Sequence, residues 1–170
     1  GGLGGGHRRF ALVLGGLRMN YEDLLVEAFR AELARQGLRP ETARVVRGFG
    51  ARLPDEGRAV FSGPGAPTAV LAGHEGIAAA LYGELAELGQ RVGRNVALVS
   101  ALPAIDNRMM SPRLTHFDAD LDAAGVALAE RLIAVLLERG DARRLPGPAL
   151  VPMRLVARAS HFMTAASTSI

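Results

Sequence analysis

Apolar residues along this chain fall in short continuous runs that alternate with stretches of helical spacing. A short apolar run bounded by turn residues is typical of a strand that is buried on both faces, as in a parallel sheet. Glycine and proline residues separate many of the runs, which supports this division. The pattern predicts strands over residues 10–14, 44–47, 68–72, 95–100, 114–117 and 150–156.

Between the predicted strands, apolar residues recur every three or four positions, as in helices with one buried face. The first helix begins at Asn20, whose side chain is expected to cap it, and ends at Gly37. Glu22 is assigned to its polar face. Its expected apolar stripe consists of Leu25, Ala28, Phe29 and Leu33. Further helices are predicted over residues 54–61, 75–88 and 118–139.

Two of these helices carry more apolar surface than packing on one side requires. The helix over 75–88 is apolar nearly all round, so it is either enclosed in a core or pressed against a partner. The helix over 118–139 starts with Asp118, Asp120 and Asp122, which suit the positive end of a helix dipole. Its expected apolar face consists of Leu121, Gly125, Leu128, Leu132 and Leu136.

The alternation of buried strands and helices predicts a doubly wound parallel α/β sheet. In such sheets ligands bind outside the carboxyl ends of the strands. The loops at this expected functional edge follow Leu14, Arg47, Ala72 and Val99. Residues 1–7 are expected to form a flexible lead-in, 8–160 the folded domain and 161–170 a frayed tail.

The composition agrees with one folded domain. Of the 170 residues, 49% are apolar and 22% charged, and the absence of cysteine excludes disulfides and cysteine-based zinc or nucleophile sites. The sequence has neither an apolar run of roughly 18 residues, as a membrane span requires, nor a signal-peptide pattern. We therefore expect a cytoplasmic protein with no membrane partner.

The net charge of +3 does not by itself indicate a nucleic-acid surface. All 20 basic residues are arginines, and they are interspersed with 17 acidic residues. No basic stripe follows the spacing of a phosphate backbone, so we expect no DNA contact by this chain itself.

Few residues show the spacing of a catalytic or metal site. The four histidines are too widely spread for a metal motif, and the turn after the first strand lacks the GxGxxG pattern. No GxSxG elbow occurs either, so we expect no metal, no cofactor and no enzyme activity. His74 and Glu75 lie where a strand ends and a helix starts, so His74 is either a ligand contact or a residue that only begins the helix, with Glu75 suiting the helix dipole. A small α/β enzyme would use this pair as acid and base.

Six short motifs, in order along the chain, resemble the effector domain of the LacI/GalR family of bacterial transcription regulators. They are HRRF at 7–10, DEG at 55–57, PTAVLA at 67–72, LGQRVGRNVALV at 88–99, SPRLT at 111–115 and LVARAS at 155–160. The resemblance covers the second half of a typical member, without the helix-turn-helix headpiece. It implies the type I periplasmic-binding-protein-like fold, mainly its C-terminal subdomain plus part of the N-terminal subdomain.

The resemblance also implies which residues face the ligand. Leu25 stands where sugar- and purine-binding members carry an arginine, and Leu102 stands where they carry an aspartate. Because these two groups are the best readers of hydroxyls, a simple sugar is not the expected effector. The other expected ligand-binding residues are Met19, Asn20, Tyr21, His74 and Arg52, with Phe49 as the alternative to Arg52.

By the same resemblance, the chain is the effector-binding and dimerisation part of a regulator. A small molecule would control operator binding by the headpieces of a homodimer, with an interface expected at Ile77, Leu81 and Leu85. The helix over 118–140 would belong to the N-terminal subdomain and would expose its apolar face unless a partner or further sequence covers it. The alternative is a periplasmic-type solute-binding protein of an importer, which a signal peptide on the intact gene would favour.

Overall fold

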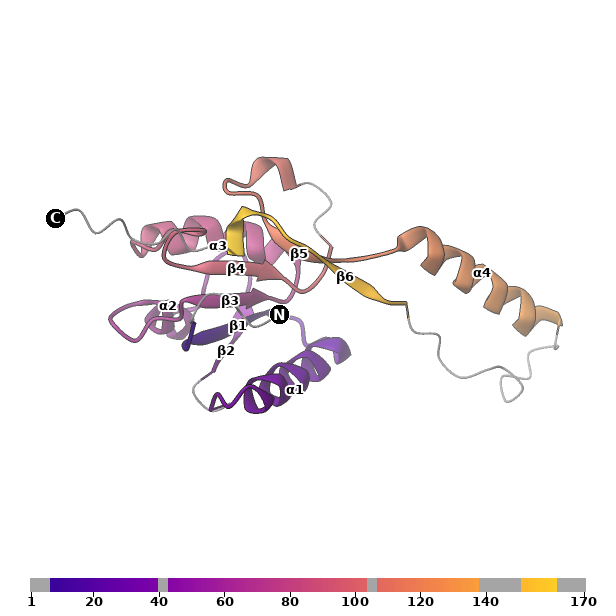
Figure 1. Cartoon of the computed structure of the whole chain (residues 1–170), viewed down its shortest axis with the longest axis horizontal. Coiled ribbons are helices and arrows are strands. Elements are labelled where there is room, and N and C mark those ends of the chain that lie inside the picture. Colours follow the sequence, from indigo (N-terminus) through magenta and orange to yellow (C-terminus); the bar gives the residue numbers. More distant parts are fainter. Residues whose placement is uncertain (1–6, 40–42, 104–106, 138–150, 162–170) are drawn as a thin grey trace.

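The computed structural model describes residues 7–39, 43–103, 107–137 and 151–161. Every predicted strand and helix has a counterpart, with ends shifted by a few residues. Parts of four predicted segments lie outside the described residues: 1–6, 138–140, 150 and 162–170. The elements, shown in Figure 1, are β1 (Phe10–Gly15), α1 (Asn20–Arg35), β2 (Arg44–Phe49), α2 (Asp55–Phe61), β3 (Ala69–Ala72), α3 (Glu75–Glu87), β4 (Ala97–Ser100), η2 (Asn107–Met109), β5 (Thr115–Ala119), α4 (Leu121–Leu137), β6 (Met153–Val156) and η4 (Ala159–His161).

The strands form one six-stranded sheet in the order β2-β1-β3-β4-β5-β6. Parallel pairing runs without interruption from β2 through β1, β3 and β4 to β5. The predicted doubly wound parallel sheet is therefore confirmed for these strands. β6 departs from it, because it pairs antiparallel with β5, with His116 opposite Val156 and Ala119 opposite Met153. The chain leaves the sheet along β5 and returns beside the strand by which it left.

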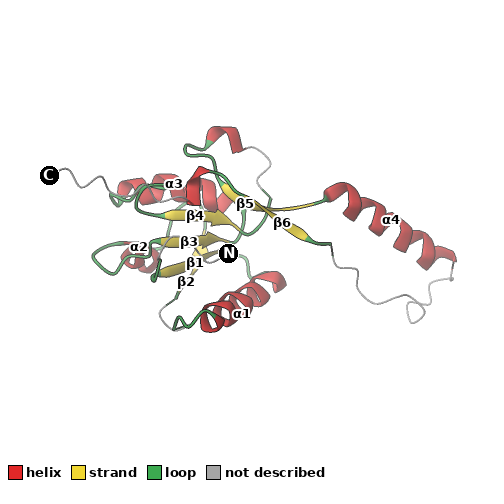
Figure 2. Ribbon diagram, in the orientation of Figure 1, coloured by secondary structure: helices red, strands yellow, loops and turns green. Residues whose placement is uncertain are grey.

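Helices cover the sheet from both sides (Figure 2). On one face, Val26 of α1 packs with Leu12 and Leu14 of β1. On the other face, Phe61 of α2 and the apolar side of α3 pack with Val13 and its neighbours in the larger core. Full burial of each large apolar side chain contributes about 1.5–3 kcal/mol, so these two layers supply most of the stability.

The apolar side chains of α3 belong to the core of their own chain. Ile77, Leu81 and Leu85 are 2%, 0% and 0% exposed. A side chain enclosed in this way cannot contact a second copy, so the sequence-based assignment of these three residues to a dimer interface is wrong. For this side of α3, the interpretation of the apolar helix as enclosed in a core is the correct one.

The start of α1 differs from the prediction in two respects. The capping position is Met19, which offers no side-chain hydrogen bond, and Asn20 is the first helical residue, so Asn20 is not the cap. Glu22, assigned above to the polar face, is buried. It lies four residues before Val26 and therefore on the same side of the helix as the buried Val26 and Leu33.

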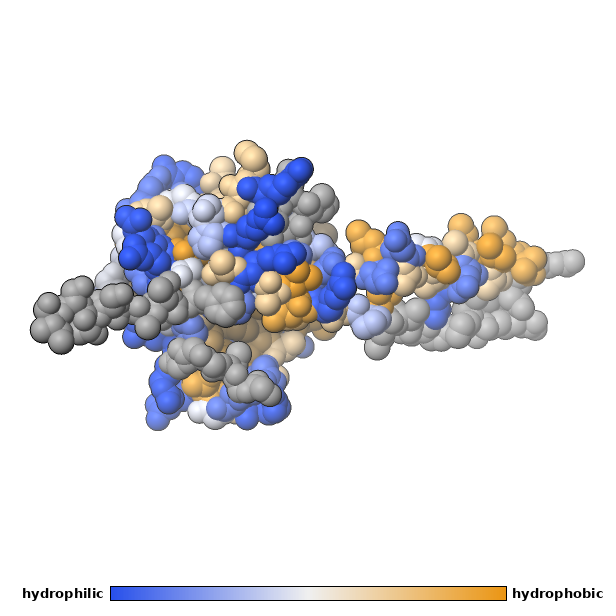
Figure 3. All heavy atoms as spheres, turned by 45° about the horizontal axis from the view of Figure 1, so that its top comes forward, coloured by the Kyte–Doolittle hydropathy of each residue, from blue (hydrophilic) through white to orange (hydrophobic). Residues whose placement is uncertain are grey.

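α4 projects away from the sheet, and none of its residues is buried (Figure 1). The Oδ1 atom of Asp120 accepts a hydrogen bond from the Ala123 N–H (3.0 Å) and caps the helix, whereas Asp118 belongs to β5 and pairs with Arg154 (3.4 Å). Figure 3 shows apolar side chains along the helix. Those most exposed are Leu121, Val126, Leu128, Leu132, Ile133, Leu136 and Leu137. The prediction that this helix exposes an apolar face is confirmed.

A buried carboxylate joins α3 to the segment that leads into α2. The Glu84 side chain accepts hydrogen bonds from Arg52 Nε (3.0 Å), the Leu53 N–H (3.3 Å) and Arg58 Nη1 (2.6 Å). Burial by itself would raise the pKa of Glu84, but the hydrogen bonds from Arg52 and Leu53 and the charges of both arginines hold it below its ordinary value. Glu84 is therefore charged when the protein is folded.

Two motifs noted in the sequence have structural roles. In the motif at 55–57, Gly57 allows α2 to lie against β2, since a Cβ there would be 2.8 Å from Val46 Cγ1. In the last motif, the buried Ser160 hydroxyl accepts a hydrogen bond from the Thr115 N–H (2.7 Å) and donates one to the Leu98 carbonyl (2.6 Å). Ser160 thus fastens η4 to β4 and β5.

Replacing Glu84 by glutamine should lower the free energy of unfolding by about 2 kcal/mol, because Arg58 loses its charged partner. The folded pKa of Glu84 is lower than the unfolded one, so its contribution is present above the ordinary value of 4.5 and is lost as the pH falls below it. Urea unfolding at neutral pH and below pH 4.5 should show less acid sensitivity in Glu84→Gln than in the parent. Glu87→Gln is the control, and equal acid sensitivity of Glu84→Gln and the parent would contradict this account.

Replacing Ser160 by alanine should also cost about 2 kcal/mol, because a buried N–H and a buried carbonyl lose one partner. Ser62→Ala is the matched control, since the Ser62 hydroxyl donates to the Arg58 carbonyl on the exposed surface. Thermal or urea unfolding checks the difference. Equal stability of the two variants would show that Ser160 does not fasten η4 to the sheet.

Candidate functional site

The carboxyl ends of β1, β3 and β4 meet at one edge of the sheet, which we call the carboxyl edge. Hydrogen bonds continue the ladder beyond the strands, from the Gly73 N–H to the Val13 carbonyl (2.8 Å) and from the Ala101 N–H to the Ala72 carbonyl (2.8 Å). The loops at 15–19, 73–74 and 101–103 are therefore neighbours. They bring Met19, His74 and Leu102, which are far apart in sequence, to the same edge.

His74 starts α3 as its N-cap residue. Its Nδ1 atom accepts hydrogen bonds from the backbone N–H groups of Gly76 (3.1 Å) and Ile77 (3.4 Å). An accepting Nδ1 assigns the ring proton to Nε2, and the cap bonds do not use Nε2. His74 is thus a residue at the helix start, as the sequence allowed, and the structure adds that it caps the helix. The same ring keeps one N–H donor for other contacts.

The loop after β4 is held by Ser100, which is buried. The Ser100 hydroxyl donates to the Leu102 carbonyl (2.8 Å) and accepts from the Leu102 N–H (3.3 Å). These bonds occupy the hydroxyl and fix the course of the turn. Leu102 is consequently held half-buried at the carboxyl edge, where it contributes apolar surface rather than a charge.

A buried carboxylate supports the loop after β1. Glu22 is 1% exposed, and its Oε1 atom accepts a hydrogen bond from the Gly15 N–H (3.2 Å). Oε2 makes no hydrogen bond within the described part of the chain, but Arg47 Nη1 lies 3.5 Å from it. Because a buried charge is costly unless it is paired, Arg47 stabilises Glu22, and Glu22 in turn fixes the end of β1.

The same arginine extends the network across the first turn of α1. Arg47 Nη2 donates to Asp23 Oδ1 (2.9 Å), and Arg18 Nη2 lies 3.2 Å from Asp23 Oδ2. Arg47 therefore links the end of β2 to Glu22 and Asp23. The two arginines balance the two carboxylates, so this part of the carboxyl edge carries no net charge.

Apolar and neutral polar side chains are exposed at the start of α1. Leu17, Met19 and Leu24 are 80%, 50% and 66% exposed. Burial, and secondly the charge of the neighbouring carboxylate, raise the pKa of the half-buried Tyr21, so its phenol stays neutral and can donate a hydrogen bond. With the exposed amide of Asn20, the edge combines apolar contact with a few polar groups, as in many small-molecule sites.

Three residues assigned to the ligand from the sequence are engaged elsewhere. Leu25 is half-buried against the core cluster formed by Leu12, Leu14 and Val26. Arg52 donates from Nε to Glu84 (3.0 Å) and from Nη2 to Glu87 (2.6 Å), which holds its guanidinium on α3. Phe49, the alternative to Arg52, is 4% exposed and belongs to the core. Neither the Arg52 nor the Phe49 side chain is therefore available at the carboxyl edge, although the Phe49 carbonyl accepts a hydrogen bond from the Gly16 N–H (3.1 Å).

Glu22 and Arg47 are the residues of this edge that the sequence analysis did not find. A signal for Glu22 exists, because its spacing of four residues from Val26 puts a carboxylate on the apolar stripe. For Arg47 the only signal is its position near the end of a predicted strand. Their pairing depends on strand order, since β2 lies beside β1 and so brings Arg47 next to the start of α1.

The described residues contain no cluster of side chains suited to a metal ion. Within them, no group of three or more histidine, aspartate or glutamate side chains is arranged to hold a metal ion. None of the described helices has the length and apolar character needed to cross a membrane.

Known proteins resemble this chain over most of its length. The family model for the periplasmic binding protein-like domain matches residues 3–161. The HTH-type transcriptional regulator AglR of Rhizobium meliloti is 28% identical over 162 residues, which are 91% of this chain and 44% of that protein. A probable opine utilization operon repressor of Rhizobium rhizogenes is 28% identical over 166 residues, covering 92% of this chain and 83% of that protein.

Among solved structures, the Lac repressor dimer bound to operator and the anti-inducer ONPF superposes with a TM-score of 0.74 at 23% identity. The superposition covers 92% of this chain and 46% of the repressor chain, so this chain spans about half the length of that protein and of AglR. The match of the family model over nearly the whole chain decides the family. The chain belongs to the periplasmic binding protein-like domain family, and the two curated relatives that it resembles are named as a transcriptional regulator and an operon repressor.

Proposed function

We propose that this chain is the effector-binding part of a LacI-type transcription regulator, in which a small molecule at the carboxyl edge controls operator binding by a DNA-binding headpiece. The observation that carries the proposal is the agreement of fold and relatives over 91% and 92% of the chain, since both curated relatives are named as regulators. The regulator acts on operator DNA and is accordingly cytoplasmic. This chain itself contributes the ligand site rather than the DNA contact.

The chemistry of the carboxyl edge favours an effector that is partly apolar. Leu102 and the exposed Met19 supply apolar contact, while Asn20, Tyr21 and the Nε2 N–H of His74 supply neutral hydrogen-bonding groups. Leu25 and Leu102 stand where sugar-binding members of the family carry an arginine and an aspartate. The bidentate hydrogen bonds that read sugar hydroxyls are therefore missing. We propose a ligand with an apolar or aromatic body rather than a simple sugar.

The exposed face of α4 supports the presence of a second subdomain in the regulator. A helix with seven large apolar side chains more than half exposed is not stable against water by itself. We propose that the face packs on an N-terminal subdomain. A ligand held between the two subdomains would favour their closed arrangement and so change the spacing of the headpieces, by a shift of population.

We propose that the regulator is a homodimer formed through the outer side of α3. On that side the exposed residues between the two terminal glutamates are Gly76, Ala79, Gly83 and Ala86, which are small and uncharged. Met109 of η2, which is 89% exposed, borders a hollow of about 440 Å³ beside Ala79. A protruding apolar side chain beside a hollow suits a two-fold contact, because each copy can fill the hollow of the other.

The two alternatives receive less support. The curated relatives are named as regulators, which favours regulation over solute import. An enzyme using His74 as a base would need a ring nitrogen with a free lone pair, whereas the Nδ1 lone pair accepts the cap bonds and Nε2 carries the proton.

A thermal-shift screen of the longest protein that the gene encodes should find effectors among aromatic and apolar acids rather than sugars. A ligand at a hundred times its Kd stabilises the folded state by about 2.7 kcal/mol, which such a screen detects. Asn20→Ala should reduce the shift, and Glu27→Ala, an exposed residue farther along α1, should leave it unchanged. A sugar as the best ligand, with Asn20→Ala behaving as the parent, would contradict the proposed chemistry.

Gly83→Arg should convert the dimer to a folded monomer. A Cβ at Gly83 meets no atom within 4 Å in the single chain, so the variant should fold, and the arginine would occupy the proposed contact. Ala31→Arg, on the exposed side of α1, is the control and should remain dimeric. Leu81→Arg should instead abolish folding, since its charge would be buried. Sedimentation velocity with circular dichroism separates these outcomes, and a dimer unaffected by Gly83→Arg would refute the interface.

A further inference from the structure

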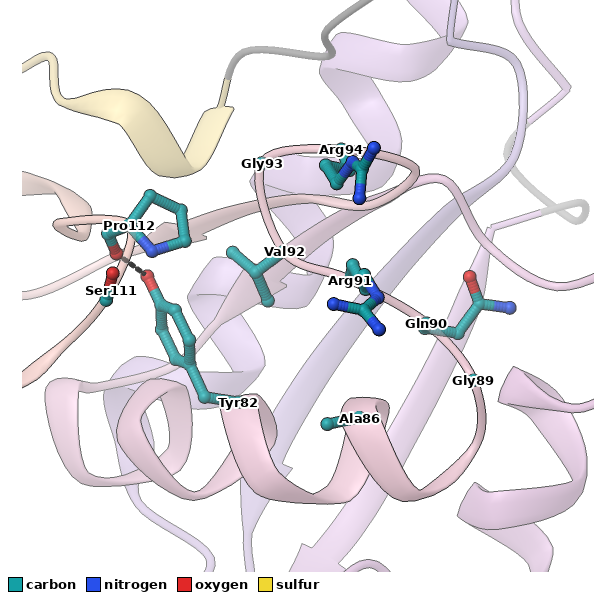
Figure 4. A pocket seen from close by; sticks show the side chains of 10 residues that line it. All are labelled: Tyr82, Ala86, Gly89, Gln90, Arg91, Val92, Gly93, Arg94, Ser111 and Pro112. Atoms are coloured by element: carbon teal, nitrogen blue, oxygen red, sulfur yellow. Dashed lines mark hydrogen bonds between the residues drawn. The ribbon is translucent and has the colours of Figure 1, made fainter. Parts of the chain in front are cut away.

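A second hollow lies at the opposite edge of the sheet from the proposed effector site. It has a volume of about 600 Å³ and lies between the second half of α3, the loop over residues 89–94 and the Ser111-Pro112 segment (Figure 4). These two segments precede β4 and β5, so the hollow is at the amino edge of the parallel strands. Its size is within the range of about 300–1,000 Å³ that is usual for small-molecule sites.

The polar lining of this hollow is cationic. Arg91 and Arg94 both line it, and neither guanidinium has a hydrogen-bond or ion-pair partner elsewhere in the described chain. No acidic residue is part of the lining. The carboxylates in the second half of α3, Glu84 and Glu87, are paired with other arginines on the side of the helix that faces α2.

The loop that carries the two arginines is held in place by its own contacts. The Arg91 N–H donates to Asn95 Oδ1 (2.6 Å), and Val92 is anchored in the core. Gly93 has a φ of +75°, and a Cβ at this position would be 2.7 Å from Pro112 Cγ, so only glycine allows the loop to lie against Pro112. The arginines therefore start from a fixed backbone, and less ordering is required when a ligand binds.

The rest of the lining is compatible with a negatively charged ligand. Near the end of α3 the carbonyls of Ala86 and Leu85 are occupied, because they accept hydrogen bonds from the N–H groups of Gly89 and Gln90 (3.0 and 2.8 Å). The Tyr82 hydroxyl donates to the Pro112 carbonyl (2.5 Å), and burial raises its pKa to about 12, so it adds no negative charge. Gln90 and Ser111 add uncharged hydrogen-bonding groups.

We propose that this amino-edge hollow is a second ligand site, separate from the effector site, and that it binds a small anionic molecule through the guanidiniums of Arg91 and Arg94. Both carboxylates and phosphates fit this chemistry, because each accepts the fork of hydrogen bonds that a guanidinium donates. The apolar side chains of Val92 and Pro112 provide contact for the carbon skeleton of the ligand. All residues of this site belong to the present chain, so it would bind its anion whatever effector occupies the carboxyl edge.

Isothermal titration of the full chain with citrate and with pyrophosphate tests the proposal and distinguishes the two anion classes. The double variant Arg91→Ala/Arg94→Ala should bind the preferred anion at least about tenfold more weakly, since each charge-assisted hydrogen bond contributes enough for about that factor. The control is Arg8→Ala/Arg30→Ala, which removes the same charge from two exposed residues elsewhere. Its affinity should equal that of the parent.

Two results would overturn the proposal. One is the absence of binding of either anion to the parent chain at millimolar concentration. The other is an equal loss in both double variants, which would indicate attraction by net charge rather than a site. Sedimentation of Arg91→Ala/Arg94→Ala should match the parent, so that a loss of binding is not mistaken for a change in association.

Discussion

The burial of a parallel sheet on both faces is the constraint on which the rest of this structure depends. Parallel strands need crossover connections, and the helices in these connections must cover the sheet. α1 covers one face and α2 with α3 the other, which explains why Ile77, Leu81 and Leu85 are enclosed. Because β1 to β5 run the same way, their carboxyl ends meet at one edge and their amino ends at the other. The two edges thereby acquire different chemistry.

Arginine supplies the cations of both edges and of the links between helices. Its fork can serve two acceptors at once, and this chain uses that property repeatedly. Arg47 reaches Glu22 and Asp23, and Arg58 reaches Glu84 and Glu87. These networks place the start of α1 and fasten α2 to α3, so they are structural. Arg91 and Arg94 stand apart from them, because they line a hollow without carboxylates.

Two surfaces of the described chain remain uncovered, α4 and the outer side of α3. α4 exposes apolar side chains along its length, and the chain matches about half the length of AglR and of the Lac repressor. Burying its face against a second subdomain would couple α4 and β6 to any ligand held between the two. The outer side of α3 is different, since small residues rather than large ones are exposed there. Small residues allow a second helix to approach closely, and they expose little apolar area to water when no partner is bound.

The sequence by itself determined the order of strands and helices, the parallel sheet, the loops that share the carboxyl edge and the exposed face of α4, because periodicity and turn residues are local signals. It also led to the family through six short motifs. It could not decide which side of the apolar α3 faces inward, nor that Glu22 is buried, because both depend on what packs against the helix. Only the tertiary structure joined Arg52 to Glu84, Arg47 to Glu22 and Arg91 to the amino-edge hollow. These contacts link residues distant in sequence, and their formation depends on strand order and on loop position, for which single residues carry no local signal.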